Sequence, residues 1–303
     1  MALDLVVELV NLCVELTQFG QAYGKSRDEQ FYRRLEKARS TPGKPGDLLL
    51  AKFCNDCERR SAKTLNDSHL FMKWGIALRC RASRAEVSEA DRLCAEADQK
   101  FSHALAIDSN NEEIHAARVE TILRRAQLHS GSPEGCRLLT EACEMCRRRV
   151  GIVASGKHDA RLLWVWGASL AGLAEIEKGA EAERLYDEAE AKFRRAYGMW
   201  PEPEFQLDRA QALLYRSMLH RGDDRQEMLT RVCDLCRGMV ENQSGGYKAL
   251  VIWGAALSCQ VAHAGPDAER IFAEGNEQFA RAKSVDPERA KAEITRVLAK
   301  VFR

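Results

Sequence analysis

A unit of about 90 residues recurs along this chain, and the repetition limits its possible folds more than any other feature. The clearest marker is a Trp-Gly pair with Leu three residues after the Gly, and it begins at Trp74, Trp166 and Trp253. These tryptophans lie 92 and 87 residues apart in a chain of 303 residues. Repetition at a fixed period is typical of arrays in which each copy buries its apolar surface against the next copy.

Two further elements recur in the same order. Downstream of each Trp-Gly pair, an Ala-x-Arg segment leads to Phe-x-x-Ala, which begins at Phe101, Phe193 and Phe279. Between these blocks a Leu precedes Cys-x-x-Cys, and the cysteine pairs are Cys54/Cys57, Cys143/Cys146 and Cys233/Cys236. The repeat therefore has two different halves, one marked by Trp-Gly and Phe and the other by cysteines.

The local pattern is helical throughout. Ala, Leu, Glu, Arg and Lys dominate, apolar residues recur at spacings of three and four, and no alternating run is bounded by hairpin turns. Ser132-Pro133 and Asp286-Pro287 are typical of helix starts, and Asp223-Asp224 is expected to cap a helix that begins near Arg225. These signals predict an all-α fold with no sheet.

The breaks divide the chain into antiparallel helical hairpins within one repeat domain, 1–303. We expect an N-terminal half-unit over 1–65 with a loop insertion at 27–46, a unit over 66–153, a second over 158–243 and a truncated one over 246–303. The expected helices are 66–83, 86–108, 111–130, 132–153, 158–178, 180–200, 203–221, 224–243, 246–264, 266–285 and 288–303. A further amphipathic helix is expected at 1–19.

The Trp-Gly hairpins resemble the tetratricopeptide repeat (TPR). Trp166-Gly167 with Leu170, followed by Ala189, Phe193, Ala196 and Pro201, matches its loose consensus, and the other two copies match similarly. A Gly inside a helix costs about 1 kcal/mol relative to Ala, so three such glycines imply that a neighbouring helix comes close. The Phe is then expected to fill the space between hairpins.

The chain also departs from the TPR pattern. The Gly-to-Phe distance is 25 or 26 residues, longer than in a standard repeat, and the hairpins at 111–153 and 203–243 match the consensus poorly. The resemblance implies a right-handed superhelical solenoid of helix hairpins, in which the first helix of each hairpin lines a concave face that binds peptides.

On that face the resemblance places seven candidate partner-binding residues, which are His69, Met72, Arg79, Arg161, Trp164, Lys248 and Val251. The Asn that holds a terminal carboxylate in chaperone-binding TPR proteins is replaced by Ile76, Ala168 and Ala255, so that clamp is not expected. A mixed groove of basic and aromatic residues would suit an acidic or extended peptide. The alternative is that several of these residues pack against the next hairpin.

The cysteine pairs allow a metal or redox interpretation, because positions i and i+3 share a helix face. Successive pairs, however, lie in separate units, too far apart to share one zinc ion, and Cys is also a good small buried residue. Packing is therefore the favoured interpretation, and no cofactor or metal is predicted.

Composition excludes several function classes. With 46 basic and 45 acidic residues, the chain has a formal charge of +1, which argues against nucleic acid or anionic membranes as partners. No segment is typical of a signal peptide or a membrane span, and the cysteine content suggests a reducing, cytoplasmic compartment. Nucleotide-binding and hydrolase motifs are missing from the sequence.

The sequence thus favours a non-enzymatic scaffold or adaptor that binds a protein or peptide on its concave face. A helical metal, redox or catalytic protein that uses the Cys-x-x-Cys pairs is the alternative. Self-assembly through the end units, including the apolar face of helix 1–19, is a third hypothesis.

Overall fold

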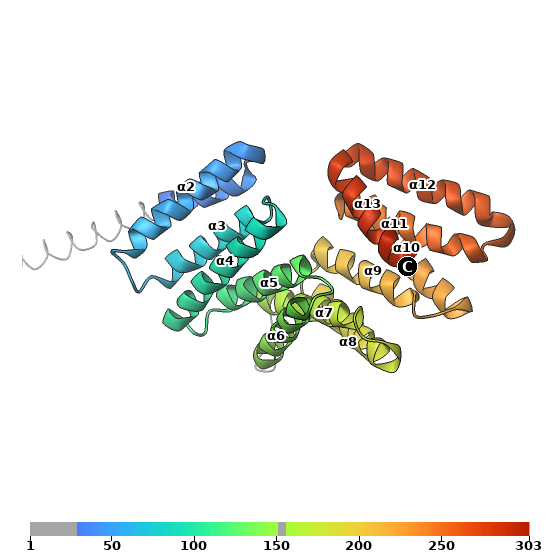
Figure 1. The fold of residues 1–303 in the computed structure, drawn as a ribbon, viewed down its shortest axis with the longest axis horizontal. Coiled ribbons are helices and arrows are strands. Elements are labelled where there is room, and N and C mark those ends of the chain that lie inside the picture. Colours follow the sequence, from blue (N-terminus) through green and yellow to red (C-terminus); the bar gives the residue numbers. More distant parts are fainter. Residues whose placement is uncertain (1–28, 151–155, 303) are drawn as a thin grey trace, which may run out of the picture. The chain divides into compact units, whose positions relative to one another are not determined.

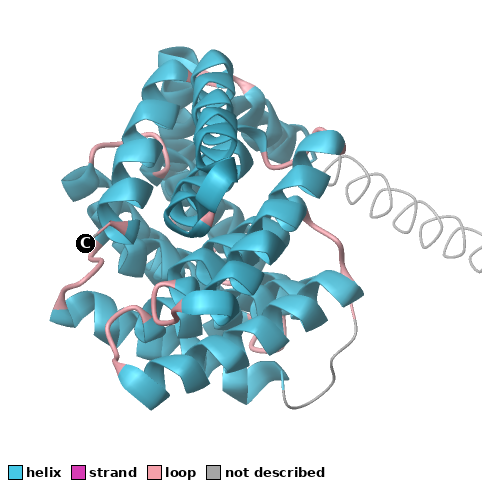
Figure 2. Ribbon diagram, turned by 90° about the vertical axis from the view of Figure 1, so that its right-hand side faces the viewer, coloured by secondary structure: helices cyan, strands magenta, loops and turns pink. Residues whose placement is uncertain are grey.

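The computed structural model describes residues 29–150 and 156–302, and every regular element there is a helix (Figures 1 and 2). Residues 29–40 are helical, and the elements that follow are α2 (Gly43–Ser61), α3 (Ser68–Ala82), α4 (Val87–Ile107), α5 (Glu112–Leu128), α6 (Pro133–Val150), α7 (Lys157–Ala174), α8 (Gly179–Met199), α9 (Pro203–Ser217), α10 (Gly222–Glu241), α11 (Gly246–Gln260), two short 3₁₀ turns at Val261–His263 and Gly265–Asp267, α12 (Ala268–Val285) and α13 (Pro287–Val301). The predicted all-α class is confirmed, whereas the expected helix 1–19 lies outside the described residues.

The helices form two compact units, Met1–Thr121 and Ile122–Arg303, and the boundary falls within α5. In the first unit α3 packs on α2 and α4; in the second, each of the helices α6 to α12 packs on its successor. This order is that of consecutive antiparallel hairpins, as the repeats predict. The four-part division of the chain and the right-handed superhelical path stay predictions.

In all three copies, the Gly of the Trp-Gly pair faces the Phe of Phe-x-x-Ala. A Cβ atom on Gly75 would lie 2.7 Å from the Phe101 ring, closer than real Cβ atoms approach a neighbour. The equivalent pairs are Gly167 with Phe193, at 3.1 Å, and Gly254 with Phe279, at 2.7 Å. The expected close approach is therefore confirmed, but Phe packs inside its own hairpin and not between hairpins, because it lies on the second helix opposite the glycine.

The expected loop insertion at 27–46 is wrong for most of its described length. Residues 29–40 are helical, and the break before α2 is confined to Thr41 and Pro42. Proline is tolerated in the first turn of a helix, so Pro45 does not prevent α2 from starting at Gly43. The short turn is fixed by Arg84, whose guanidinium donates to the Arg39 carbonyl at 3.0 Å and to Asp47 at 3.1 Å.

Two of the three predicted helix starts are confirmed by their caps. The Ser132 hydroxyl accepts from the Gly135 N–H at 3.1 Å, and the Asp286 carboxylate accepts from the Arg289 N–H at 3.1 Å. The third is wrong, since α10 begins one residue before Asp223 and makes no side-chain cap hydrogen bond. Asp223 and Asp224 lie in its first turn, where the helix dipole favours negative charge.

The Gly–Phe contact predicts opposite effects of two alanine substitutions. Gly75→Ala is expected to lower the free energy of unfolding by about 1–2 kcal/mol, because overpacking against Phe101 outweighs the gain in helix propensity. Gly238→Ala is the control: this Gly lies in α10, and a Cβ there would meet nothing within 4 Å. The control is expected to raise the free energy by about 0.5–1 kcal/mol. Urea unfolding followed by circular dichroism measures both, and changes of the same sign would contradict the contact.

Candidate functional site

The surface predicted to meet a partner belongs to the first helices of the hairpins. In the second unit these are α7, α9 and α11, and α9 contacts both of the others. We call the exposed side of these three helices the first-helix face. In the first unit, α3 carries the three predicted residues His69, Met72 and Arg79.

Two of the α3 residues are engaged by the fold itself. Met72 is only 3% exposed, so it belongs to the core and does not meet a partner. Arg79 forms an ion pair with Glu120 of α5 and donates to the Ala117 carbonyl at 3.3 Å. The alternative that these residues pack against the next hairpin therefore fits Arg79, while Met72 is buried in the core.

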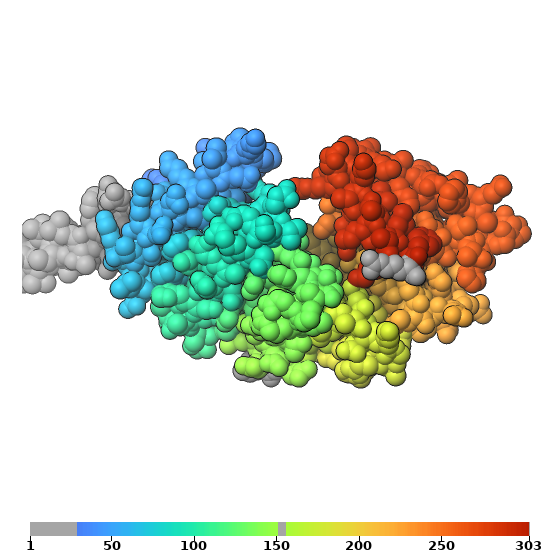
Figure 3. Space-filling model, viewed as in Figure 1, coloured from blue at the N-terminus to red at the C-terminus, as the bar shows by residue number. Residues whose placement is uncertain are grey.

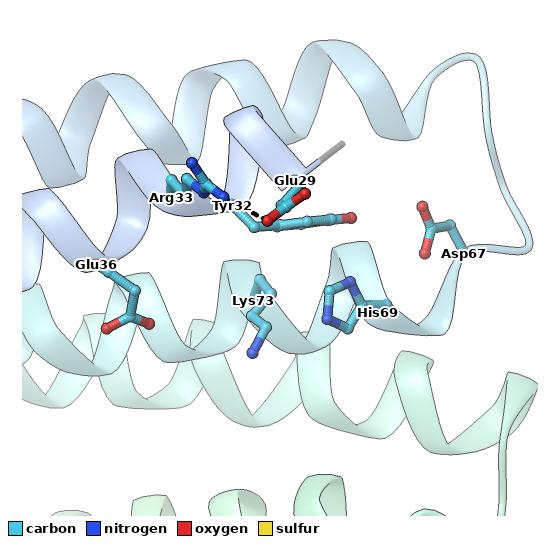
Figure 4. Close-up of a pocket in the computed structure, with 7 residues that line it drawn as sticks. All are labelled: Glu29, Tyr32, Arg33, Glu36, Asp67, His69 and Lys73. Carbon is cyan, nitrogen blue, oxygen red and sulfur yellow. Dashed lines mark hydrogen bonds and ion pairs between the residues drawn. The ribbon is translucent and has the colours of Figure 1, made fainter. Parts of the chain in front are cut away.

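His69 lines an open pocket of about 590 Å³ between residues 29–36 and α3 (Figure 4). Its lining residues are Glu29, Tyr32, Arg33, Glu36, Asp67, His69 and Lys73. The Tyr32 ring stacks edge-on against the imidazole at 4.3 Å, while Glu29 pairs with Arg33 and Lys73 lies 3.9 Å from Glu113. The lining mixes three carboxylates with two basic side chains, so the pocket presents little net charge to a ligand.

The first-helix face is centred on Trp164 of α7 and Asp208 of α9. The indole Nε1–H donates to the Asp208 carboxylate at 2.9 Å, and the indole stacks on Phe205 with ring centroids 5.4 Å apart. Trp164 is partly buried, so part of its side chain stays exposed. An aromatic ring held by a hydrogen bond and a stacking partner is a rigid contact surface.

The surroundings of Asp208 disfavour the charged form of its carboxyl group. Burial raises its pKa above the ordinary value, and the Trp164 hydrogen bond and the nearby Lys248 ammonium oppose that rise only in part. A cation from a ligand placed beside Asp208 would stabilise its charged form. Lys248 itself is exposed at the start of α11, as expected for a partner-binding residue.

The two remaining predicted residues differ in accessibility. Arg161 lies on α7 one turn before Trp164 and is partly exposed. Val251 is fully buried within α11, so partner contact is wrong for it as it is for Met72. The TPR resemblance placed both residues on the outward side of a first helix, but both side chains are buried. Arg161, Trp164 and Lys248 remain as the accessible set in the second unit.

One feature of this face was missed by the sequence analysis: α13 reaches across it. Lys300 pairs with Glu175 just after α7, and its ammonium lies 4.5 Å from the centroid of the Tyr215 ring of α9. Arg296 donates to Gln211 of α9 at 3.0 Å. In the space-filling view, α13 is the dark red segment at the C-terminal end of the colour scale (Figure 3). The amphipathic pattern of 288–303 predicted the helix but could not identify the surface under it.

The cysteine pairs lie at contacts between hairpins. α2, α6 and α10, which carry them, pack on α3, α7 and α11. All six thiols are buried, and burial raises the pKa of Cys54 to about 11 and those of Cys143 and Cys233 to about 12. Because the thiolate is the metal ligand and the nucleophile, such thiols are poorly suited to either role. Among the described residues no three His, Cys, Asp or Glu side chains converge as a metal site would require.

The described helices include none whose length and apolar character would allow it to cross a bilayer. The basic run Arg147, Arg148 and Arg149 lies in the last turn of α6, where cations interact favourably with the helix dipole.

Neither a family model nor a curated protein matches this sequence. Two solved structures of TPR proteins are similar to the chain. The yeast Tom70 structure matches with a TM-score of 0.43 and 17% identity over 88% of this chain, which spans 56% of the length of Tom70. The C-terminal part of a TPR repeat-containing protein from Cytophaga hutchinsonii matches with a TM-score of 0.38 and 11% identity, covering 87% of this chain and 99% of that one.

Proposed function

We propose that this protein is a non-enzymatic interaction scaffold that binds a peptide or protein segment on the first-helix face of its second unit. The observation that carries the proposal is the Trp164–Asp208 pair, in which a partly exposed indole donates a hydrogen bond to a partly buried carboxylate. Arg161 and Lys248 flank this pair with exposed or partly exposed cations. Aromatic anchors bordered by charged groups are typical of protein-binding surfaces.

The raised pKa of Asp208 supports the same role. A carboxylate whose charged form is disfavoured by partial burial is costly in the free protein, and a ligand group that donates to it or carries positive charge recovers that cost on binding. The face also offers cations for acidic groups, so a peptide with both charges fits it best. A reducing, cytoplasmic setting remains part of the proposal, in keeping with the buried free thiols.

A pull-down with charge-reversed protein tests this function. The double variant Arg161→Glu/Lys248→Glu is expected to lose partners that wild type retains, because each substitution opposes a charge at the edge of the Trp164–Asp208 pair. Arg184→Glu/Arg270→Glu makes the same charge change on exposed residues of α8 and α12 and is the control. If both variants retain all wild-type partners, identified by mass spectrometry, the first-helix face is not the binding surface.

A further inference from the structure

α13 occupies a different position from the helix that it should resemble. Both α9 and α13 follow the second helix of a Trp-Gly hairpin, and both start with Pro as the first residue. α9 covers the outer side of α8: Arg216 pairs with Glu183 and Asp187, and Arg209 pairs with Glu190. As a result Tyr186, at the centre of this side, is only 4% exposed.

The corresponding side of α12 is open around Phe272, although α12 also packs on α13. Phe272 occupies the position of Tyr186 in the third copy, yet it is 56% exposed. Asn276, at the position of Glu190, is exposed as well. A large apolar side chain that is buried in one copy and uncovered in the next indicates that its covering helix lies elsewhere.

α13 packs against both α11 and α12, and its C-terminal part extends toward the other first helices. Its apolar residues Ala290, Val297 and Val301 are buried. Its basic residues Arg296 and Lys300, four positions apart on the same side, meet Gln211 of α9 and Glu175 at the end of α7. α13 therefore packs on α11 and reaches α9 and the residue that follows α7 through Arg296 and Lys300, as an amphipathic helix does when it binds in a groove.

The charges explain this placement. Glu175, the side-chain oxygen of Gln211 and the face of the Tyr215 ring all attract cations, and α13 supplies its cations to them. Since α13 belongs to the same chain, its effective concentration at the face is high.

We propose that α13 is an internal occupant of the first-helix face, and that the external partner is an amphipathic helix with two basic residues four positions apart, which displaces it. The proposal rests on the proposed function and names its partner and its regulation. On displacement, α13 moves onto the open side of α12 and covers Phe272, as α9 covers Tyr186. The apolar surface that becomes buried there offsets part of the stabilisation that α13 gives up when it leaves the first-helix face.

A labelled peptide with the sequence of residues 286–303 tests this exchange in the full-length chain. Arg296→Glu/Lys300→Glu in the protein opposes both cation contacts of α13, and we expect this opened variant to bind the peptide about tenfold or more tightly than wild type does. A peptide that carries the same two substitutions is expected not to bind. Lys283→Glu/Lys291→Glu, at exposed positions, is the control protein and should bind like wild type.

The outcomes are separable. Equal peptide affinities of the opened variant and wild type would overturn the inference and make α13 a plain end helix. Should charge reversal unfold the protein, which circular dichroism would show, the milder Arg296→Gln/Lys300→Gln variant carries the same expectation. Unchanged partner lists in the pull-down, together with peptide binding to the opened variant, would reject the proposed function alone. Altered lists without peptide binding would reject only the role of α13.

Discussion

Replacing Phe193 by alanine is expected to lower the free energy of unfolding of the second unit by about 3–5 kcal/mol. Phe193 is 1% exposed, and its ring fills the space left by Gly167 across the α7–α8 hairpin. The substitution removes a large apolar side chain from the core, so the free energy gained by burying it is lost. It also leaves a cavity that backbones already in close contact cannot close, so the loss should fall in the upper part of the range for core residues.

Phe272→Ala provides the matched control, because it makes the same chemical change at a site that is 56% exposed. Its effect is expected to stay within about 0.5 kcal/mol. Urea unfolding followed by circular dichroism compares the two variants. Since a repeat contacts mainly its neighbours, hydrogen exchange should accelerate in α7 and α8 and remain unchanged in α3 and α4. Equal losses from the two substitutions would mean that the Gly–Phe contact does not hold the hairpin.

Much of this architecture could be predicted from the sequence because the repeat marks the same structural position three times. Trp74, Trp166 and Trp253, which share the Trp-Gly motif, are each 6–8% exposed. Helix ends were found to within a few residues because proline, glycine and capping side chains act locally. The length of the break at Thr41 and Pro42 was overestimated, as a loop over 27–46, because turn residues were read only locally. Local turn residues do not show that Arg84, distant in sequence, would hold the two helices close.

The candidate site was less predictable, because outward and inward positions on a first helix depend on the helix beside it. Met72 and Val251 follow the same helical spacing as Trp164, but the neighbouring helices cover them. The Asp208 partner of Trp164 lies 44 residues away on a hairpin that matches the TPR consensus poorly. Charge and burial, which determine whether such a pair forms, are properties of the assembled unit and not of either segment.

The same limit applies to the contacts between hairpins. Asp98 pairs with Arg118, and Glu190 pairs with Arg209, at equivalent places in the first and second copies. The repeat alignment places Asp98 and Glu190 at the same position, so it could have predicted that both carboxylates form this ion pair. The third copy has Asn276 at that place, and Asn276 is exposed although α13 packs on α12. The loss of the carboxylate and the displaced helix thus occur in the same copy.

Arg209→Met should destabilise the second unit by about 3 kcal/mol, because it leaves the Glu190 carboxylate buried without its main partner. Arg209 holds both oxygens of Glu190, at 2.6 and 2.9 Å, and Glu190 is only 7% exposed. Arg194 and Arg231 approach the same carboxylate at 3.3 and 3.4 Å, which keeps the expected loss at the lower end of the range for broken buried pairs.

The double variant Glu190→Met/Arg209→Met tests whether the loss of stability in Arg209→Met comes from the lost ion pair or from the unpaired Glu190 carboxylate. If the cost arises from the stranded carboxylate, removing both groups should restore stability to within about 1 kcal/mol of wild type, because apolar pairs of similar volume often replace buried ion pairs without loss. Arg137→Met, which breaks an exposed pair with Glu134, should cost less than about 1 kcal/mol. High salt should abolish that small effect but leave the Arg209→Met effect, since buried pairs are weakly screened. A double variant as unstable as Arg209→Met would instead assign the link between α8 and α9 to the ion pair itself.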